Sequence, residues 1–209
     1  MGNEVYVTES GPDGPAGVLR EWVLTFQASL YGETIEQILA LDGGGCRPMP
    51  LVCSGCSSAQ AKAELSGKRP AELFPGSPAP EAAMSGLWLY FSCFDECHQV
   101  CQDLATAEGS YWHAILHRQE PDAGNAAYWF RRVGRHPVYP ALAELARVIL
   151  HREPDALFTV AQTWDPFAFV DFCESARHAP ADAPAHRAAR EIQLAEWQLL
   201  FDYCARPRQ

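Results

Sequence analysis

The most informative stretch of the chain is Ser110–Pro137, SYWHAILHRQEPDAGNAAYWFRRVGRHP. Its apolar and aromatic residues recur at helical spacing, and proline and glycine mark where one helix ends and the next begins. His113 and His117 are four residues apart, so on a helix their side chains point the same way. Ionisable and aromatic side chains at this density are more natural in a lined cleft than in a plain core. The stretch therefore predicts helices and marks the place of a functional site.

The helical pattern continues on both sides of this stretch and predicts seven helices in the C-terminal part of the chain. Ser110 is expected to cap the second of them, Gly134 to end the third, and Asp165 followed by Pro166 to begin the sixth. We therefore predict a mainly α fold, a compact helical bundle whose core lies in these helices. Their expected ranges are Glu81–Ala105, Tyr111–Arg118, Ala123–Val133, Pro140–His151, Ala156–Gln162, Pro166–Arg177 and Ala185–Ala205.

The N-terminal part, residues 1–80, is predicted to be a less regular segment packed on a helical core of residues 81–209. Residues 1–17 suggest a flexible arm with at most a short strand. Prolines predict an irregular Cys46–Cys56 and a surface connector at Lys68–Pro80. The expected elements are a strand at Glu4–Thr8 and helices at Arg20–Leu30, Thr34–Leu41 and Ser58–Leu65.

Composition bounds the class of protein. The chain has 209 residues, 48% of them apolar, which suits one compact domain. A formal charge of −10 makes nucleic acid and anionic membranes poor partners. No apolar run approaches the roughly 20 residues of a membrane span, and no secretory signal is visible. We therefore expect a cytoplasmic protein, and the sequence leaves its oligomeric state open.

The eight cysteines are expected to be reduced and ordinary. Cys53-Ser-Gly-Cys56, with Cys46 nearby, has the spacing of metal-binding thiols, but a structural zinc site needs a second such pair. Cys93, Cys97 and Cys101 follow one another at helical spacing and are predicted to be small apolar residues on a buried face.

The sequence contains one internal echo. Ile115–Asp122 recurs, one residue shorter, as Ile149–Asp155. The spacing is that of a helical-hairpin repeat, but two copies are too few for a solenoid. The simpler interpretation is that both segments are helix ends, each with a basic last turn followed by proline.

A constellation of histidines emerges when Phe91–Ala105 is placed on a helical wheel. Asp95, His98 and Gln102 fall together at the edge of its apolar arc. The connection to the next helix is short, so His113 and His117 should lie close by. We expect His98, His113 and His117 to converge with the Asp95 carboxylate. Such ligands fit a divalent metal, Zn, Fe or Mn, and an open position would let bound water act as a nucleophile.

The candidate catalytic residues are Asp95, His117 and Glu120, which could orient, ligate or transfer protons. The same histidines also fit a metal-free polar cleft. A third reading is purely structural: they could cap carbonyls, stack on Trp112 or Trp129, or pair with Glu120. Glu196 and Asp202 interrupt the apolar last helix, and one of them could be a buried partner of the histidines.

Further polar residues are candidates for binding a small polar or anionic ligand. An inward-facing arginine would hold a carboxylate or phosphate through two hydrogen bonds. Arg131 and Arg132 are adjacent, so only one of them can face a given cleft. The candidate set for substrate binding is Gln102, Arg118, Asn125, Tyr128 and Arg131.

These residues resemble a widespread family of uncharacterised bacterial and fungal proteins. The resemblance covers about Leu87 to Cys204 and implies a shared helical fold with the same polar cluster, but no reaction. Asp95–His98 with Gln102, Trp164–Phe167 and Gln193–Phe201 fit the same pattern. Its most specific residues are Tyr111–Arg118 (YWHAILHR), Glu120–Asp122 (EPD), Asn125, Tyr128–Gly134 (YWFRRVG) and His136-Pro137.

Three functions compete. The first is an enzyme, metal-dependent or not, that acts on a small polar or anionic molecule in a histidine-rich cleft. The second is a helical interaction module, in which Asn125–Leu145 forms a groove lined by Tyr128, Trp129 and Tyr139. That module predicts His113 and His117 on separate surfaces with no common cavity. A separation of their imidazoles from His98 of well beyond about 10 Å would favour it, since metal–nitrogen bonds are only about 2 Å long. The third is a metal-free domain that binds a ligand in the same cleft without turnover.

Overall fold

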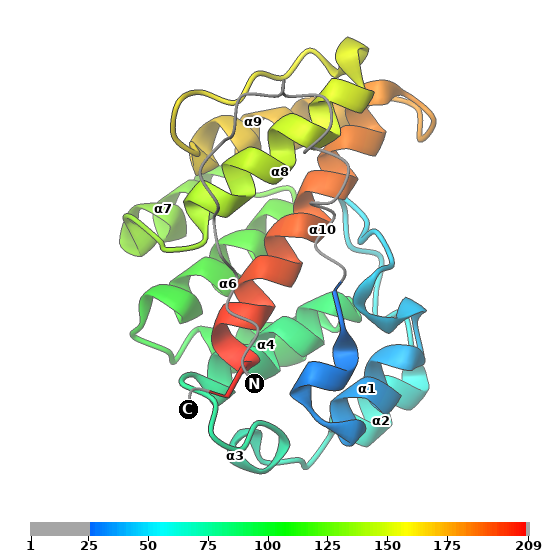
Figure 1. The fold of residues 1–209 in the computed structure, drawn as a ribbon, viewed down its shortest axis with the longest axis vertical. Helices are drawn as coiled ribbons and strands as arrows, with labels where there is room; N and C mark the ends of the chain where they lie inside the picture. The colour runs from blue at the N-terminus through cyan, green and yellow to red at the C-terminus, as the bar shows by residue number, and fades with distance from the viewer. Residues whose placement is uncertain (1–25, 208–209) are drawn as a thin grey trace, which may run out of the picture.

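The computed structural model describes residues 26–207, and every regular element in that range is helical. The mainly α prediction is therefore confirmed, while the strand expected at Glu4–Thr8 and most of Arg20–Leu30 lie outside the described residues. The elements, shown in Figure 1, are η2 Ala28–Tyr31, α1 Glu33–Ala40, η3 Gly43–Gly45, α2 Ala59–Leu65, α3 Pro70–Leu73, α4 Pro80–Tyr90, α5 Phe94–Cys101, α6 Ala107–Gln119, α7 Ala123–Val133, α8 Tyr139–Arg152, η4 Pro154–Ala156, α9 Pro166–Ala176 and α10 Pro184–Ala205.

The long helix α10 runs through the molecule and packs against α4, α8 and α9 (Figure 1). On α10, Trp197 is fully buried and donates a hydrogen bond from its indole N–H to the carbonyl oxygen of Gly86 on α4, at 2.8 Å. A Cβ at Gly86 would lie 2.8 Å from the ring of Trp112 on α6. Glycine at this position therefore lets three helices meet closely, and this contact fixes α6 in the core.

Helix α6 is the buried centre of the fold, since every residue from Gly109 to Gln119 is buried. It begins one turn earlier than the sequence predicts. Thr106, and not Ser110, is its N-cap, and its hydroxyl accepts a hydrogen bond from the N–H of Gly109. Ser110 instead lies buried inside the helix. The polar side chains of α6 are thus held in the interior by the packing around them.

The other predicted caps are confirmed. Asp165 accepts hydrogen bonds from the N–H groups of Phe167 and Ala168, with Pro166 as the first helical residue. Gly134 ends α7 with a positive φ of 65°. The echoed segments are both helix ends, because α6 and α8 each stop just before a Glu-Pro pair.

Two predicted helices are wrong. The range Glu81–Ala105 is broken between α4 and α5, where Ser92 has a φ of 56°. The carbonyl oxygen of Phe91 accepts a hydrogen bond from the N–H of Ser57, at 2.7 Å, a distant residue that a helical wheel cannot include. The range Ala156–Gln162 is irregular after η4, because Phe158 stacks on Phe172 with ring centroids 4.5 Å apart instead of continuing a helix.

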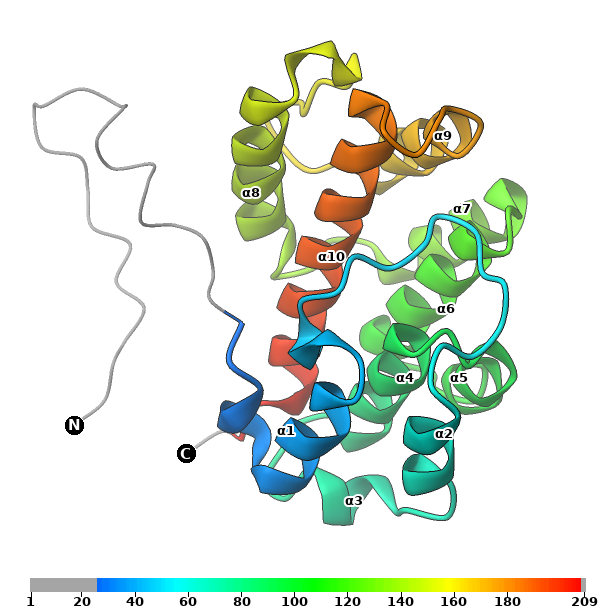
Figure 2. The ribbon, with the colours of Figure 1, turned by 90° about the vertical axis from the view of Figure 1, so that its right-hand side faces the viewer.

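An irregular segment, residues 46–58, crosses from α10 in front of α6 to α2, as Figure 2 shows in cyan; we call it the strap. Arg190 on α10 donates to the carbonyl oxygen of Pro48, at 2.7 Å. The N–H of Cys53 donates to the carbonyl oxygen of Gln119 at the end of α6, at 3.0 Å. Met49 and Leu51 are buried in the common hydrophobic core. The strap therefore ties the N-terminal segment to the helices that carry the histidines.

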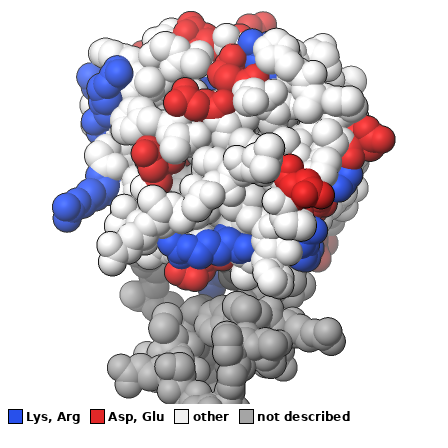
Figure 3. All heavy atoms as spheres, turned by 90° about the horizontal axis from the view of Figure 1, so that it is seen from above, with Lys and Arg blue, Asp and Glu red and all other residues white. Residues whose placement is uncertain are grey.

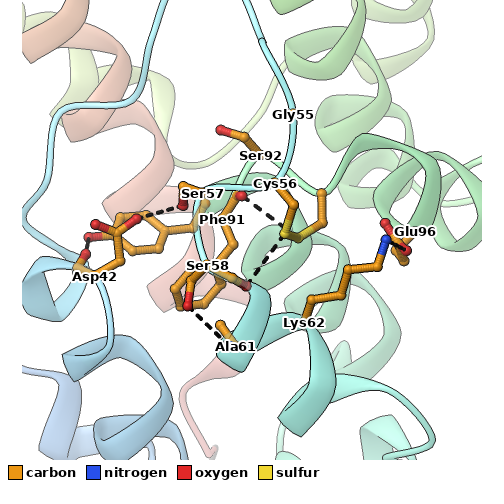
Figure 4. Close-up of a disulfide and its surroundings, with 12 residues drawn as sticks. Asp42, Gly55, Cys56, Ser57, Ser58, Ala61, Lys62, Phe91, Ser92 and Glu96 are labelled. Atoms are coloured by element: carbon orange, nitrogen blue, oxygen red, sulfur yellow. Dashed lines mark hydrogen bonds and ion pairs between the residues drawn. A yellow bond between two sulfur atoms is a disulfide. The ribbon is translucent and has the colours of Figure 1, made fainter.

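A disulfide joins Cys56 of the strap to Cys93 in the turn between α4 and α5 (Figure 4). The expectation that all eight cysteines are unpaired is therefore wrong for these two. Spacing along the chain could not reveal the pair, because the partners are 37 positions apart and are brought together only by the path of the strap. Cys97 and Cys101 are free and buried, as predicted for an apolar face of α5.

One end of the molecule carries charges of both signs on its surface (Figure 3). On the end of the molecule formed by α8, α9 and the start of α10, basic and acidic side chains lie interspersed among uncharged residues (Figure 3). Among residues 26–207, no helix combines the length and the apolar character needed to cross a membrane.

Candidate metal centre

Three imidazoles meet where α5 packs on α6. His98 comes from α5, and His113 and His117 lie one turn apart on α6. One ring nitrogen from each residue can be chosen so that all three lie within 4.8 Å of one another. The predicted convergence of the histidines is therefore confirmed. The Asp95 carboxylate does not belong to this group.

The rings are held by aromatic packing. The rings of His113 and His117 are stacked, with centroids 4.7 Å apart, and His98 meets His113 edge-on, also at 4.7 Å. Trp129 from α7 also stacks on His113, with ring centroids 3.9 Å apart. Stacking on two neighbouring rings restricts the orientation of the His113 ring.

His117 has a carboxylate partner. Its Nδ1 lies 2.8 Å from Oε2 of Glu120, the residue that ends α6. If Nδ1 carries the proton and donates it to Glu120, Nε2 presents its lone pair. A carboxylate that holds one nitrogen of a histidine while the other faces a metal is the usual outer-shell arrangement of metal sites. Glu120 therefore acts as an orienting residue for His117.

His113 stands out by its unsatisfied nitrogens. Both Nδ1 and Nε2 are buried, and neither has a hydrogen-bond partner among the described residues. Burial, followed by the nearby His117 and His98, lowers the pKa of His113 from 6.5 to about 3. The ring is therefore neutral at physiological pH and keeps a lone pair for a metal.

The distances are compatible with a metal after a small closure. Zinc–nitrogen bonds of about 2.0–2.1 Å place tetrahedral ligand atoms roughly 3.3 Å apart. The ring nitrogens lie within 4.8 Å of one another, so binding an ion would require them to approach by up to about 1.5 Å. Three imidazole ligands suit zinc well and iron or manganese also.

An acidic cleft of about 640 Å³ adjoins residues that neighbour the histidines, although none of the three histidines lines it. Its wall includes Glu120, the hydrogen-bond partner of His117, and Asp95, which lies one turn before His98 on α5. The wall carries one ammonium group, from Lys62, and four carboxylates, from Asp95, Glu96, Glu120 and Asp122. The remaining lining residues are Val52, Cys53, Gly55, Cys56, Ser92, Cys93, Phe94, Gln119 and Pro121.

The predicted substrate-binding residues are not brought to this cleft. Gln102, Asn125 and Tyr128 are exposed, and none of them lines the cleft. The guanidinium of Arg131 lies over the ring of Phe167, 5.9 Å from its centroid. Arg118, the fifth candidate, points to the other side of α6.

Arg118 is buried and forms an ion pair with Glu196 on α10, at 2.5 Å. Glu196 also accepts a hydrogen bond from the hydroxyl of Tyr111, at 2.9 Å. The buried partner suggested for the histidines therefore belongs to Arg118 instead. Asp202 accepts a hydrogen bond from Tyr31 and pairs with Arg206.

Sequence reasoning missed Gln119, whose fully buried side chain lies in the wall of the cleft. Its Oε1 and Nε2 have no partner among the described residues. The only signal was its position, since it sits between two residues already singled out, Arg118 and Glu120. Lys62 and Glu96 were also missed, because their ion pair joins α2 to α5 across a long stretch of sequence.

The wide separation of the histidines that would favour the interaction module is not found. The ring centroid of His98 lies 4.7 Å from that of His113 and 5.8 Å from that of His117. Tyr139, expected in an exposed groove, is buried in the core.

Searches of protein-family models, of curated proteins and of solved structures found no match to this chain.

Proposed function

We propose that this protein is a metal-dependent enzyme in which His98, His113 and His117 bind one divalent cation. The observation that carries the proposal is the approach of three ring nitrogens to within 4.8 Å, two of them from buried residues. Burial of imidazoles without partners is costly unless something satisfies their nitrogens. A metal ion does so, and the neutral imidazole of His113 offers it one ring nitrogen with a free lone pair.

Three protein ligands leave a coordination position open, which is typical of catalytic sites rather than structural ones. A divalent cation held in this way supplies Lewis acidity, which polarises a substrate oxygen and makes water more acidic. The adjoining cleft provides room for a small polar molecule.

The residues of the cleft would divide the remaining work. Glu120 would hold His117 in the tautomer that presents Nε2. Asp95 is exposed in the cleft wall, and no hydrogen bond or ion pair engages its carboxylate in the described part of the chain. It is therefore the residue best placed to accept a proton from a bound substrate or water.

Metal analysis tests this proposal. Untagged protein, purified without a nickel column, should contain about one zinc, iron or manganese ion per chain, and His113→Ala should contain none. His136→Asn is the matched control, because His136 is equally buried but lies outside the cluster. The proposal would be overturned if the purified wild type contained no metal and its stability did not change when a chelator was added.

Turnover is tested separately. Metal-loaded protein is incubated with a small-molecule extract, and compounds are followed by mass spectrometry. We expect at least one polar compound to be consumed by the wild type and not by His113→Ala. An extract unchanged by metal-loaded wild type would leave a metal-binding protein that is not an enzyme.

A further inference from the structure

The charge of the cleft beside the histidines is strongly one-sided. The first turn of α5 supplies Asp95 and Glu96, and the link between α6 and α7 supplies Glu120 and Asp122. Among the described lining residues, Lys62 is the only lysine or arginine. It pairs with Glu96 at 2.5 Å, as Figure 4 shows. The cleft is thus a poor receptor for an anion and a good one for a cation.

Not all of these carboxylates are engaged. Oδ1 of Asp122 caps α7 by accepting from the N–H of Asn125, and Glu96 is occupied by Lys62. Glu120 uses only Oε2 to hold His117. The Asp95 carboxylate makes no hydrogen bond or ion pair with any described residue. Two acidic groups, Asp95 and Glu120, therefore remain to receive a ligand.

Gln119 gives an independent sign of a ligand. Gln119 is one of the residues that line the same cleft, its side chain is fully buried, and both Oε1 and Nε2 lack a partner within residues 26–207. A buried amide left unpaired costs about 1–3 kcal/mol, so such groups are normally satisfied. A ligand that both donates and accepts hydrogen bonds would satisfy this side chain.

We propose that the cleft binds a small organic cation, whose ammonium or guanidinium group lies between Asp95 and Glu120 and whose polar remainder reaches Gln119. This names the substrate class of the proposed enzyme and in that sense rests on the proposed function. The carboxylates do not form a metal-binding group of their own in the described residues. Guanidinium and ammonium groups instead match them through charge-assisted hydrogen bonds.

The test uses a pair of probes matched in size, agmatine as the cation and glutarate as the anion. Isothermal titration calorimetry is run on chelator-stripped and on zinc-loaded protein. We expect agmatine to bind both forms, more weakly as the salt concentration rises, and glutarate not to bind. Asp95→Asn should weaken agmatine binding by about tenfold or more. Asp103→Asn, exposed on the same part of the chain but outside the cleft, should not.

Charge reversal sharpens the test, because it separates recognition from a general loss of folding. Asp95→Lys should lose agmatine binding and gain affinity for glutarate, with an unchanged circular dichroism spectrum. The proposal is overturned if agmatine fails to bind at millimolar concentration, if glutarate binds more tightly, or if Asp95→Asn binds agmatine like the wild type. Agmatine binding without metal binding would refute the metal-dependent enzyme and leave the cation site standing. Metal binding without agmatine binding would do the reverse.

Discussion

His136 is buried beneath Tyr111, Tyr139 and Tyr203, and its Nδ1 accepts a hydrogen bond from the N–H of Val138, at 3.3 Å. Its Nε2 faces Glu108, 4.0 Å away. Burial lowers the pKa of His136, and Glu108 only partly opposes this effect. The side chain is therefore held neutral in the folded protein by its surroundings.

This neutral histidine predicts an acid-sensitive fold. As the pH falls below about 6.5, His136 binds a proton in the unfolded chain but not in the folded protein, so the free energy of unfolding decreases. Because one proton is involved, the free energy of unfolding changes by at most about 1.4 kcal/mol per pH unit. The free energy of unfolding is measured with urea at pH values between 7 and 5.5. It should fall less steeply with decreasing pH in His136→Asn, which keeps an acceptor for the N–H of Val138, than in the wild type. Identical slopes in the two proteins would contradict this account of His136.

Single residues also show where sequence reasoning reaches its limit. Helical periodicity correctly predicted that His98 lies at the edge of the core and that His113 and His117 share one face of their helix. It could do so because the periodicity fixes the face on which each side chain lies. It could not show that Arg118, also on α6, faces Glu196 and not the cleft. Which neighbouring helix covers each face depends on long-range packing, such as the contact at Gly86, that no local pattern contains.

At the scale of helices, the pair Arg118–Glu196 joins α6 to α10 in the interior, with side chains 1% and 0% exposed. Removing two charges from water is costly, and only their mutual attraction and added hydrogen bonds offset this. The hydroxyl of Tyr111 and the side-chain oxygen of Gln193 supply such bonds. The pair therefore specifies how the two helices meet.

Breaking this pair should be severe. Glu196→Gln leaves the Arg118 charge buried without a counter-charge and should lower the free energy of unfolding by about 3–5 kcal/mol. Arg152→Ala breaks a pair between α8 and α10 in which both side chains are largely exposed, and should cost less than about 1 kcal/mol. Chemical denaturation measures both. Equal losses in the two variants would show that burial of the pair is not the cause.

Helices with local signals were predictable, and those shaped by distant contacts were not. Ala123–Val133 matches α7 to the residue, because Gly134 supplies the stop inside the sequence itself. The break after Tyr90 was not predicted, because it is held by distant residues. These are Ser57, whose N–H donates a hydrogen bond to the carbonyl oxygen of Phe91, and Cys56, which forms the disulfide with Cys93. That break matters for the site, because α5 starts anew at Phe94 and carries Asp95 and His98.

For the whole molecule, the strap is the connection between the N-terminal segment and the helices that carry the three histidines. It closes a loop of 37 positions through Cys56 and Cys93 and forms part of the cleft wall. Closing such a loop stabilises the fold by restricting the unfolded chain, by up to about 4 kcal/mol. The same strap places Cys53 in the cleft, where burial raises the pKa of its thiol.

Reduction should therefore destabilise the protein. Urea unfolding of the wild type with and without a reductant should show a lower midpoint in the reduced protein. Cys56→Ser should unfold at the urea midpoint of the reduced wild type, and its midpoint should not change when the reductant is added. Cys53→Ser should behave like the wild type, because Cys53 forms no disulfide. A wild type indifferent to reductant would contradict a stabilising disulfide.

Three histidines from two helices are proposed to form one metal site. Calorimetric titration of chelator-stripped protein with zinc tests it most directly, with His113→Ala and Glu120→Gln alongside. We predict one site per chain in the wild type, no site in His113→Ala, and about 10–100-fold weaker binding in Glu120→Gln, which loses the carboxylate that orients His117. Zinc binding in His113→Ala with the stoichiometry and affinity of the wild type, or no binding in the wild type, would contradict the account.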